Sequence, residues 1–184
     1  MVWHGRLGYA VGTLLLFRIA WGFAGGHWSR FASFPPSLTA VGSYLRDRTG
    51  TPLPGHSPLG ALSVYALLAV LLAQVTSGLF SDDGVEYSGP LGVRVSNAAV
   101  KWFTWYHKNV GQYALIGLVG LHLAAVLYYL CWKRRNLTAA MVVGDAAVSS
   151  GTPASRDDWH TRATAFLLLV ACSAVMWALV KLGD

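Results

Sequence analysis

The chain has 184 residues, of which 54% are hydrophobic and 12% are charged, whereas about 25% of the residues in a soluble domain carry a charge. The net charge is +6, but no basic face alternates with base-stacking aromatic residues, which argues against a nucleic-acid-binding protein. The two cysteines form no CxxC or CxxCH motif, so neither a thiolate metal cluster nor covalently attached haem is expected. The composition predicts one integral membrane domain over residues 1–184.

The first apolar segment, about residues 5–24, is expected to form a membrane helix. Its length would also suit a signal peptide, but Arg18 near its far end and the lack of a small-x-small cleavage site argue against one. His4 and Gly8 stand four residues apart at its start and share one helix face. Gly8 would either leave clearance for a flat ring bound to His4 or pack against a neighbouring helix as half of a GxxxG motif.

A connection rich in proline and glycine follows, over residues 25–57, and residues 38–46 within it are expected to form a short interfacial helix. The second membrane helix is expected over about residues 58–80, with Pro58 in its first turn. Three polar side chains lie near its end: Gln74, Thr76 and Ser77.

The third membrane helix, about residues 105–131, is apolar from Val110 to Leu130 except for Gln112 and His122. Before the apolar run stands an aromatic collar made of Trp102, Phe103, Trp105 and Tyr106. Trp and Tyr are enriched where a helix meets the lipid headgroups. A fourth apolar helix without histidine is expected over about residues 162–182, which gives an all-α transmembrane bundle of four helices.

His107 and His122 are the informative residues of the third helix. Fifteen residues separate them by roughly 22 Å along an α-helix and leave them within about 60° of one face. An imidazole inside a membrane is costly and indicates function, although each histidine could instead hydrogen-bond a neighbouring helix or, for His107, anchor the interface. Two b-type haems, one toward each leaflet, would require such a spacing. Gly111 follows His107 as Gly8 follows His4, again one turn away.

Loop charges predict the orientation of the helices. The connections after the first and third helices are basic and the one between them is acidic, so the positive-inside rule places the basic loops in the cytoplasm. The chain start, the acidic loop and the C-terminus then face the periplasm of a bacterial inner membrane. His4 and His107 consequently lie at the same outer surface on antiparallel helices, and we expect them to ligate one low-spin haem.

Arg18 lies fourteen residues after His4, at about the depth that His122 reaches from the other direction. A guanidinium at this depth needs a partner. A haem propionate would accept two hydrogen bonds from it, and snorkelling to the membrane interface is the alternative.

Five stretches of the chain together resemble the bacterial cytochrome b561 family, which includes the b-type cytochrome subunits of nickel-iron hydrogenases. These stretches are Trp3–Tyr9, Leu16–Phe31, Gly55–Pro58, Trp105–His122 and Asn136–Gly144. The resemblance runs from His4 to about Ala146, and the last helix is also similar to that of longer members. It implies a helical bundle with two b haems that passes electrons between membrane quinone and a periplasmic partner, such as a c-type cytochrome, a hydrogenase or a dehydrogenase subunit.

In this family the outer haem uses the histidines that match His4 and His107, and the inner haem uses the one that matches His122. The second ligand of the inner haem lies on a helix that would precede Met1. We expect a longer protein whose start lies upstream; the alternatives are a single-haem member or a ligand from another chain in an oligomer. His27 and His56 are the other histidines expected on the cytoplasmic side.

His56 would either belong to a quinone pocket or be an ordinary histidine at a helix start. The polar residues near the end of the second helix are a further possibility for quinone chemistry, but they lie toward the opposite surface. Two other functions are compatible with a small helical membrane protein: a cofactor-free anchor for an extrinsic enzyme, and a proton or ion transporter. The anchor would need no paired histidines, and a transporter would more often show broken helices or inverted repeats, which are not apparent in the sequence.

Overall fold

The computed structural model describes residues 2–46, 55–85, 87–134, 136–139, 152 and 154–183. Within these ranges the chain is helical between its loops, and its β-type pairing is limited to one isolated bridge between Asp82 and Ser88. The all-α prediction is therefore confirmed for the described part of the chain.

Four helical runs are long and apolar enough to cross a membrane, as predicted. They are α1 (Val2–Ala24), α3 (Pro58–Leu79), the continuous run Asn97–Cys131, and α7 (Trp159–Lys181). The third run begins well before the expected residue 105 because the Ser96 side chain caps it by accepting a hydrogen bond from the backbone N–H of Ala99. The aromatic collar is consequently part of the helix.

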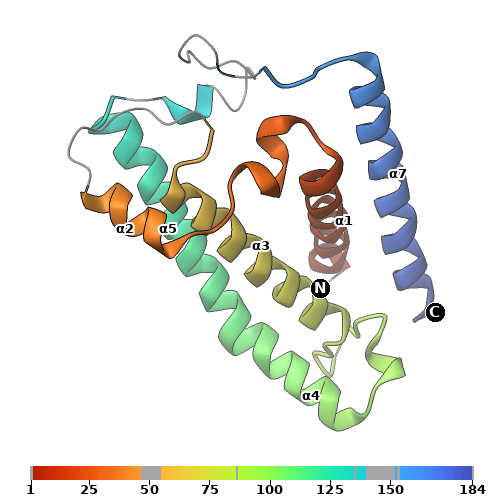
Figure 1. Cartoon of the computed structure of the whole chain (residues 1–184). Helices are drawn as coiled ribbons and strands as arrows, with labels where there is room; N and C mark the ends of the chain where they lie inside the picture. The colour runs from red at the N-terminus through yellow and green to blue at the C-terminus, as the bar shows by residue number, and fades with distance from the viewer. Residues whose placement is uncertain are drawn as a thin grey trace.

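The four runs lie side by side in the order α7, α1, α3, α5, where α5 (Gln112–Cys131) is the second half of the third run (Figure 1). Gly12 of α1 permits the close approach of its two neighbours, because a Cβ there would collide with Met176 of α7 and lie 3.1 Å from Val75 of α3. A Cβ on Gly8, in contrast, would meet nothing within 4 Å. Of the two glycines, only Gly12 is used for helix packing.

The predicted short helix is present as α2 (Leu38–Arg46), after two 3₁₀ turns, η1 (His27–Ser29) and η2 (Phe31–Ser33). The hydroxyls of Tyr44 on α2 and Tyr129 on α5 share a hydrogen bond of 2.5 Å. At the start of α3, Pro58 occupies the first turn as expected and the hydroxyl of Ser57 accepts a hydrogen bond from the Gly60 N–H.

Few apolar side chains are buried between the helices. The buried apolar residues include Leu15 on α1, Leu79 on α3 and Met176 on α7, whereas large apolar side chains such as Leu121 (68% exposed) and Phe166 (66% exposed) point outward. A water-soluble protein of this size would bury such residues, but lipid solvates them. The outer surface of the helices is therefore suited to a membrane.

Candidate functional site

His4 and His107 meet across α1 and the third helical run. Their ring centroids lie 6.0 Å apart, and the two ring planes are nearly perpendicular at 86°. His4 stands in the first turn of α1 and is exposed, whereas His107 is half-buried. The structure therefore brings together the two histidines that the loop charges placed at one surface.

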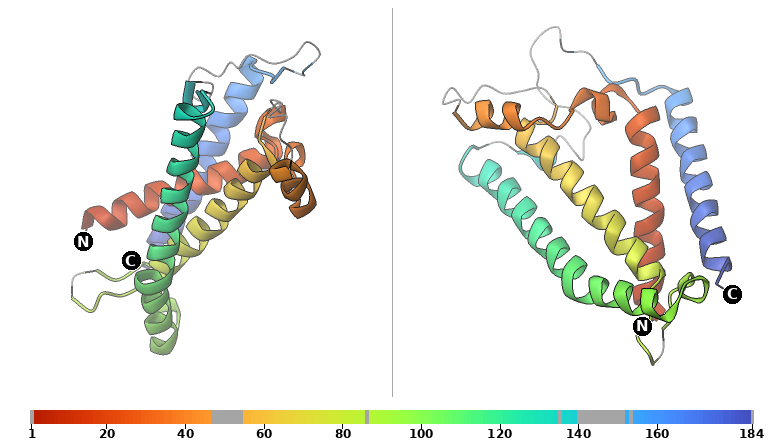
Figure 2. Two further views of the ribbon diagram at one scale, coloured as in Figure 1. Left: turned by 90° about the vertical axis from the view of Figure 1, so that its left-hand side faces the viewer. Right: turned by 60° about the horizontal axis from the view of Figure 1, so that its bottom comes forward.

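His107 opens a π turn, η4 (His107–Gly111), which joins α4 (Asn97–Tyr106) to α5 in one continuous run (Figure 2). Its closing hydrogen bond runs from the N–H of Gln112 to the carbonyl of His107. A single π turn inside an α-helix accommodates one extra residue, and such turns are frequent at functional sites. The fifteen residues between His107 and His122 therefore behave as about fourteen α-helical steps, and the two side chains are offset by about 40° in the opposite sense to the predicted 60°.

Three residues within little more than one turn of α3 contact the His107 ring: Gln74, Ser77 and Gly78. Its Nδ1 lies 3.0 Å from the carbonyl oxygen of Gln74 and 3.2 Å from the hydroxyl of Ser77. Because a carbonyl only accepts, Nδ1 must carry the proton, which leaves the lone pair on Nε2. A Cβ on Gly78 would lie 3.0 Å from the Cε1 atom of this ring, so the glycine leaves the room that the ring needs.

The side chain of Gln74 completes this arrangement. Its Nε2 donates to the backbone carbonyl of His107 at 3.2 Å and lies 3.4 Å from the His107 Nε2. Its Oε1 is buried without a hydrogen-bond partner in the described part of the chain, and it occupies the space that a Cβ on Gly111 would fill. Such an unpaired oxygen costs about 1–3 kcal/mol. The space beside Gly111 is occupied by the Gln74 side chain in this structure, so its use as clearance for a ring bound to His107 stays a prediction.

The acidic loop between α3 and α4 packs beside His4. A Cβ on Gly5 would lie 2.7 Å from Tyr87 of this loop, and the hydroxyls of Tyr87 and Tyr9 share a hydrogen bond of 2.9 Å. Burial, and then the bond to Tyr9, raise the pKa of Tyr87 well above its ordinary value. The first turn of α1 is thereby fixed against the loop, although His4 itself is exposed.

These residues fit a bis-histidine haem. Two imidazoles face each other from different helices, the proton of one is held by a backbone carbonyl as is usual for metal-ligating histidines, and open space lies beside Gly8. Among the described residues, no group of three or more His, Cys, Asp or Glu side chains could hold a bare metal ion. The two imidazoles are a donor pair that could hold haem iron.

His122 lies on the face of α5 that packs on α3. Gly111 is buried and every third or fourth residue after it is half-buried, in a stripe formed by Leu115, Leu118, His122, Val126 and Tyr129. His122 is half-buried within this stripe and makes no hydrogen bond to any described residue. The structure thus turns His122 inward, and none of the residues it describes is a hydrogen-bond partner of this imidazole.

Arg18 and His56 lie at the opposite end of α1 from His4. Arg18 donates to the carbonyl of Ser29 at 3.3 Å, and its guanidinium stands 5.2 Å from the Phe31 ring centroid. This contact with the loop after α1 corresponds to the snorkelling alternative. His56 packs on the buried Phe34 ring with a centroid distance of 4.3 Å. Burial, and then the charge of Arg18, lower the pKa of His56 and favour the neutral imidazole.

Sequence reasoning did not identify the support of His107 by α3. It treated Gln74, Thr76 and Ser77 as polar residues available for quinone chemistry, whereas Gln74 and Ser77 contact His107 and Thr76 is exposed. The signal was nevertheless present, because α3 and the third run are antiparallel and these residues were expected at the same surface as His107.

Comparison with known families agrees with this geometry. The family model of the prokaryotic cytochrome b561 matches residues 1–144, which contain α1 to α5 and all the residues of the His4–His107 site; α7 lies beyond the matched part. No curated protein and no protein of solved structure matches the chain. With four helices long and apolar enough to span a membrane, the chain is a multi-pass membrane protein that belongs to the prokaryotic cytochrome b561 family.

Proposed function

We propose that this chain is a b-type cytochrome that holds a low-spin haem between His4 and His107 and carries electrons between membrane quinone and a redox partner in the periplasm. The observation that carries the proposal is the approach of the two imidazoles to 6.0 Å from separate helices. Membership in the cytochrome b561 family supports haem binding and electron transfer.

The chain's own residues prepare the ligand at His107. The Gln74 carbonyl accepts from Nδ1, which fixes the tautomer and leaves the Nε2 lone pair as the one that would bind iron. The Gln74 side-chain amide lies 3.4 Å from this Nε2 and would have to move aside for haem to bind. The packing that half-buries His107 would lower the dielectric on its side of the site, and burial is one of the factors that tune the reduction potential. When bound, the haem supplies the one-electron couple, and no side chain is required to act as an acid, base or nucleophile in that transfer.

A second haem at His122 is part of the same proposal. It requires another imidazole, because no other histidine is found on the inward faces of α1, α3 and α5 near His122 in the described residues. We propose that a segment or chain beyond those described supplies it. Arg18 would then either pair with a propionate of this haem or keep its contact with Ser29.

We propose His56 as the residue that contacts quinone. A half-buried, neutral imidazole against the Phe34 ring can exchange a hydrogen bond with a quinone carbonyl while the ring wall packs on the apolar headgroup. The site lies at the surface opposite His4, so electrons would cross the membrane between the two ends of α1. The inner membrane of a bacterium, with His4 at the periplasmic side, is the expected location.

The haem-to-protein ratio of the purified 184-residue chain, measured by pyridine haemochrome, tests the proposal. We expect about one haem per chain and a sharp reduced α-band, as for bis-histidine iron. His4→Ala should lower the ratio at least about tenfold, since one axial bond is lost.

His160→Ala is the matched control, because His160 is an exposed histidine at the start of α7 and lies at the other end from His4. It should leave the ratio unchanged. A wild-type chain that is helical and inserted in membranes but free of haem would contradict the proposal, and so would full haem content in His4→Ala.

A further inference from the structure

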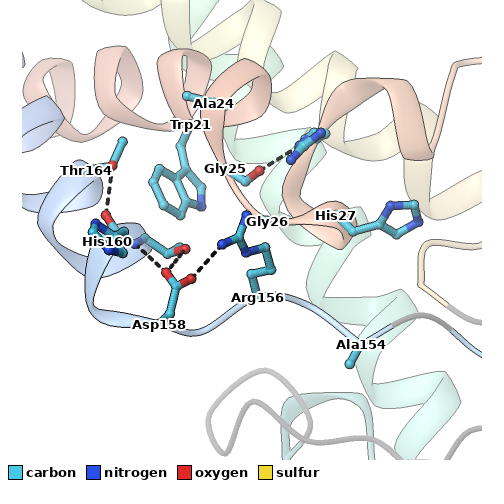
Figure 3. Close-up of a pocket in the computed structure, with 12 residues that line it drawn as sticks. Trp21, Ala24, Gly25, Gly26, His27, Ala154, Arg156, Asp158, His160 and Thr164 are labelled. Carbon is cyan, nitrogen blue, oxygen red and sulfur yellow. Dashed lines mark hydrogen bonds and ion pairs between the residues drawn. The ribbon is translucent and has the colours of Figure 1, made fainter.

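A cavity of about 310 Å³ opens between the end of α1 and the start of α7 (Figure 3). Its polar lining comes from three segments: the end of α1, the loop that follows it, and the residues that lead into α7. The side chains that the argument uses are Trp21, His27, Arg30, Arg156, Asp158 and His160. The volume is near the lower limit for ligand sites, which suits a small polar group rather than a whole lipid.

The lining carries one positive charge in excess, apart from its histidines. Arg156 is paired with Asp158 at 2.9 Å. Arg30 uses its Nε to bind the carbonyl of Gly25 at 2.7 Å, and its two terminal nitrogens make no hydrogen bond within the described part of the chain. These terminal groups form the fork that binds two phosphate oxygens at once. One free guanidinium balances the single negative charge of a phosphodiester.

The cavity lies at headgroup level. Trp21 in its wall and Trp159 at the start of α7, which is 71% exposed, are placed as the aromatic residues of a membrane interface are. Just beyond the cavity, toward the middle of the helices, Leu167 follows the lining residue Thr164 on the same face of α7 and is 66% exposed. A molecule whose phosphate lies in the cavity would therefore find an apolar surface for acyl chains beside it.

The walls are formed without a ligand. A Cβ on Gly26 would collide with the hydroxyl of Ser155, so the loop after α1 and the segment before α7 are in direct contact. Asp158 caps α7 by accepting from the N–H of Thr161 at 2.8 Å, which fixes the residues around it. The cavity therefore lies between segments whose positions are already set.

We propose that this cavity binds the phosphate headgroup of an anionic phospholipid, with Arg30 as the principal contact. Basic pockets between membrane helices are suited to such headgroups. A soluble phosphate would meet the same guanidinium, but it would gain nothing from the adjacent apolar surface. The proposal concerns the end of the molecule opposite His4 and does not depend on haem.

The test is a titration of the detergent-solubilised full chain with phosphatidylglycerol or phosphatidylcholine, with bound lipid counted by native mass spectrometry. We expect the wild type to prefer phosphatidylglycerol, and Arg30→Gln to weaken that binding about fivefold, the contribution of one arginine near a membrane surface. Arg46→Gln is the matched control, because Arg46 is an exposed arginine at the end of α2 outside the cavity lining.

Equal binding of both lipids, or equal loss in Arg30→Gln and Arg46→Gln, would overturn the proposal. Inorganic phosphate at millimolar concentration is the second probe. If it displaces phosphatidylglycerol from the wild type but not from Arg30→Gln, the cavity takes a soluble anion and the lipid assignment is wrong. Far-UV circular dichroism of each variant confirms that the helices are intact, so that a loss of binding reports the site.

Discussion

His107 and His122 stand on one helical run and on one face of it, yet their surroundings differ. The ring of His107 is held by the Gln74 carbonyl, the Ser77 hydroxyl and the space at Gly78, and it faces His4. His122 is turned toward α3 but makes no hydrogen bond within the described residues. Of these two histidines on one helix face, only His107 has its ring oriented by contacts with described residues.

The two histidines differ in whether the protein has already ordered the imidazole ring before a ligand binds. At His107 the ring orientation and the tautomer are set before any ligand arrives, so binding loses little side-chain entropy. At His122 a ligand would have to supply the partner and fix the ring. Variants of the two histidines and of the residues around them test this difference.

The largest effect is expected from His107→Ala, compared with His122→Ala. Removing His107 takes away an axial ligand, so the haem content of the purified chain should fall at least about tenfold. Removing His122 should leave the haem held between His4 and His107 in place. Reduced-minus-oxidised spectra of both variants measure this, and equal losses would show that the two histidines serve a single site.

Gly78→Val should have the next largest effect. The added side chain would enter the space of the His107 ring, whose Cε1 lies 3.0 Å from a Cβ at this position, and displacing the ligand should weaken haem affinity about tenfold or more. Gly117→Val is the control, since a Cβ on this helical glycine meets nothing within 4 Å. Haem titration of the two apoproteins measures the affinity of each variant. Similar affinities would mean that the contacts of the His107 ring with α3 are not needed for haem binding.

Ser77→Ala should have a smaller effect. It removes the hydroxyl that lies 3.2 Å from the Nδ1 of His107 but keeps the Gln74 carbonyl. Losing one hydrogen bond of about 1 kcal/mol should weaken haem binding about fivefold. Thr76→Ala changes an exposed neighbour and should have no effect. If both variants bind haem alike, the carbonyl alone orients the ring.

The smallest effect concerns the loop that fixes the His4 end. The raised pKa of Tyr87 means that folding favours its neutral form, so the docked loop keeps its full stability below pH 10.0 and loses it as the pH rises through the higher folded-state pKa. In a phenolate absorbance titration, the signal that disappears in Tyr87→Phe identifies Tyr87. In the wild-type chain this signal should appear at a higher pH than those of the other tyrosines.

Tyr9→Phe is the companion variant for this titration. It removes one of the causes of the raised pKa, so Tyr87 should then ionise closer to the ordinary tyrosine value. Ionisation of Tyr87 together with the other tyrosines in the wild-type chain would show that the loop does not pack on α1 in solution.

The membrane helices could be predicted because each needs a long apolar run, and α2 and the first turn of α3 could be predicted from local signals such as Pro58. The pairing of His4 with His107 followed from loop charge and helix direction. The predicted start of the third run at residue 105 was wrong, because the Ser96 side chain caps the helix and lets it begin at Asn97, before the aromatic collar.

The π turn and the contacts of His107 with α3 could not be predicted from the sequence. No residue type in His107–Gly111 distinguishes a π turn from an α-helix, since it arises where packing on α3 makes one extra residue in the turn favourable. The contacts of Gln74 and Ser77 depend on the relative rotation of two helices, which loop charges do not set. Their polarity could be seen, but not their partner.

The π turn also bears on how ligand spacing is compared between related chains. It takes up one residue between His107 and His122, so a relative with one residue fewer and an unbroken α-helix would present its two histidines in nearly the same relative position. An insertion that is taken up by the π turn thus leaves the relative position of the two histidines nearly unchanged. The same insertion elsewhere between His107 and His122, in an unbroken α-helix, would rotate His122 away from the bundle. Sequence distance between the histidines is therefore a poor guide to family membership unless the turn between them is known.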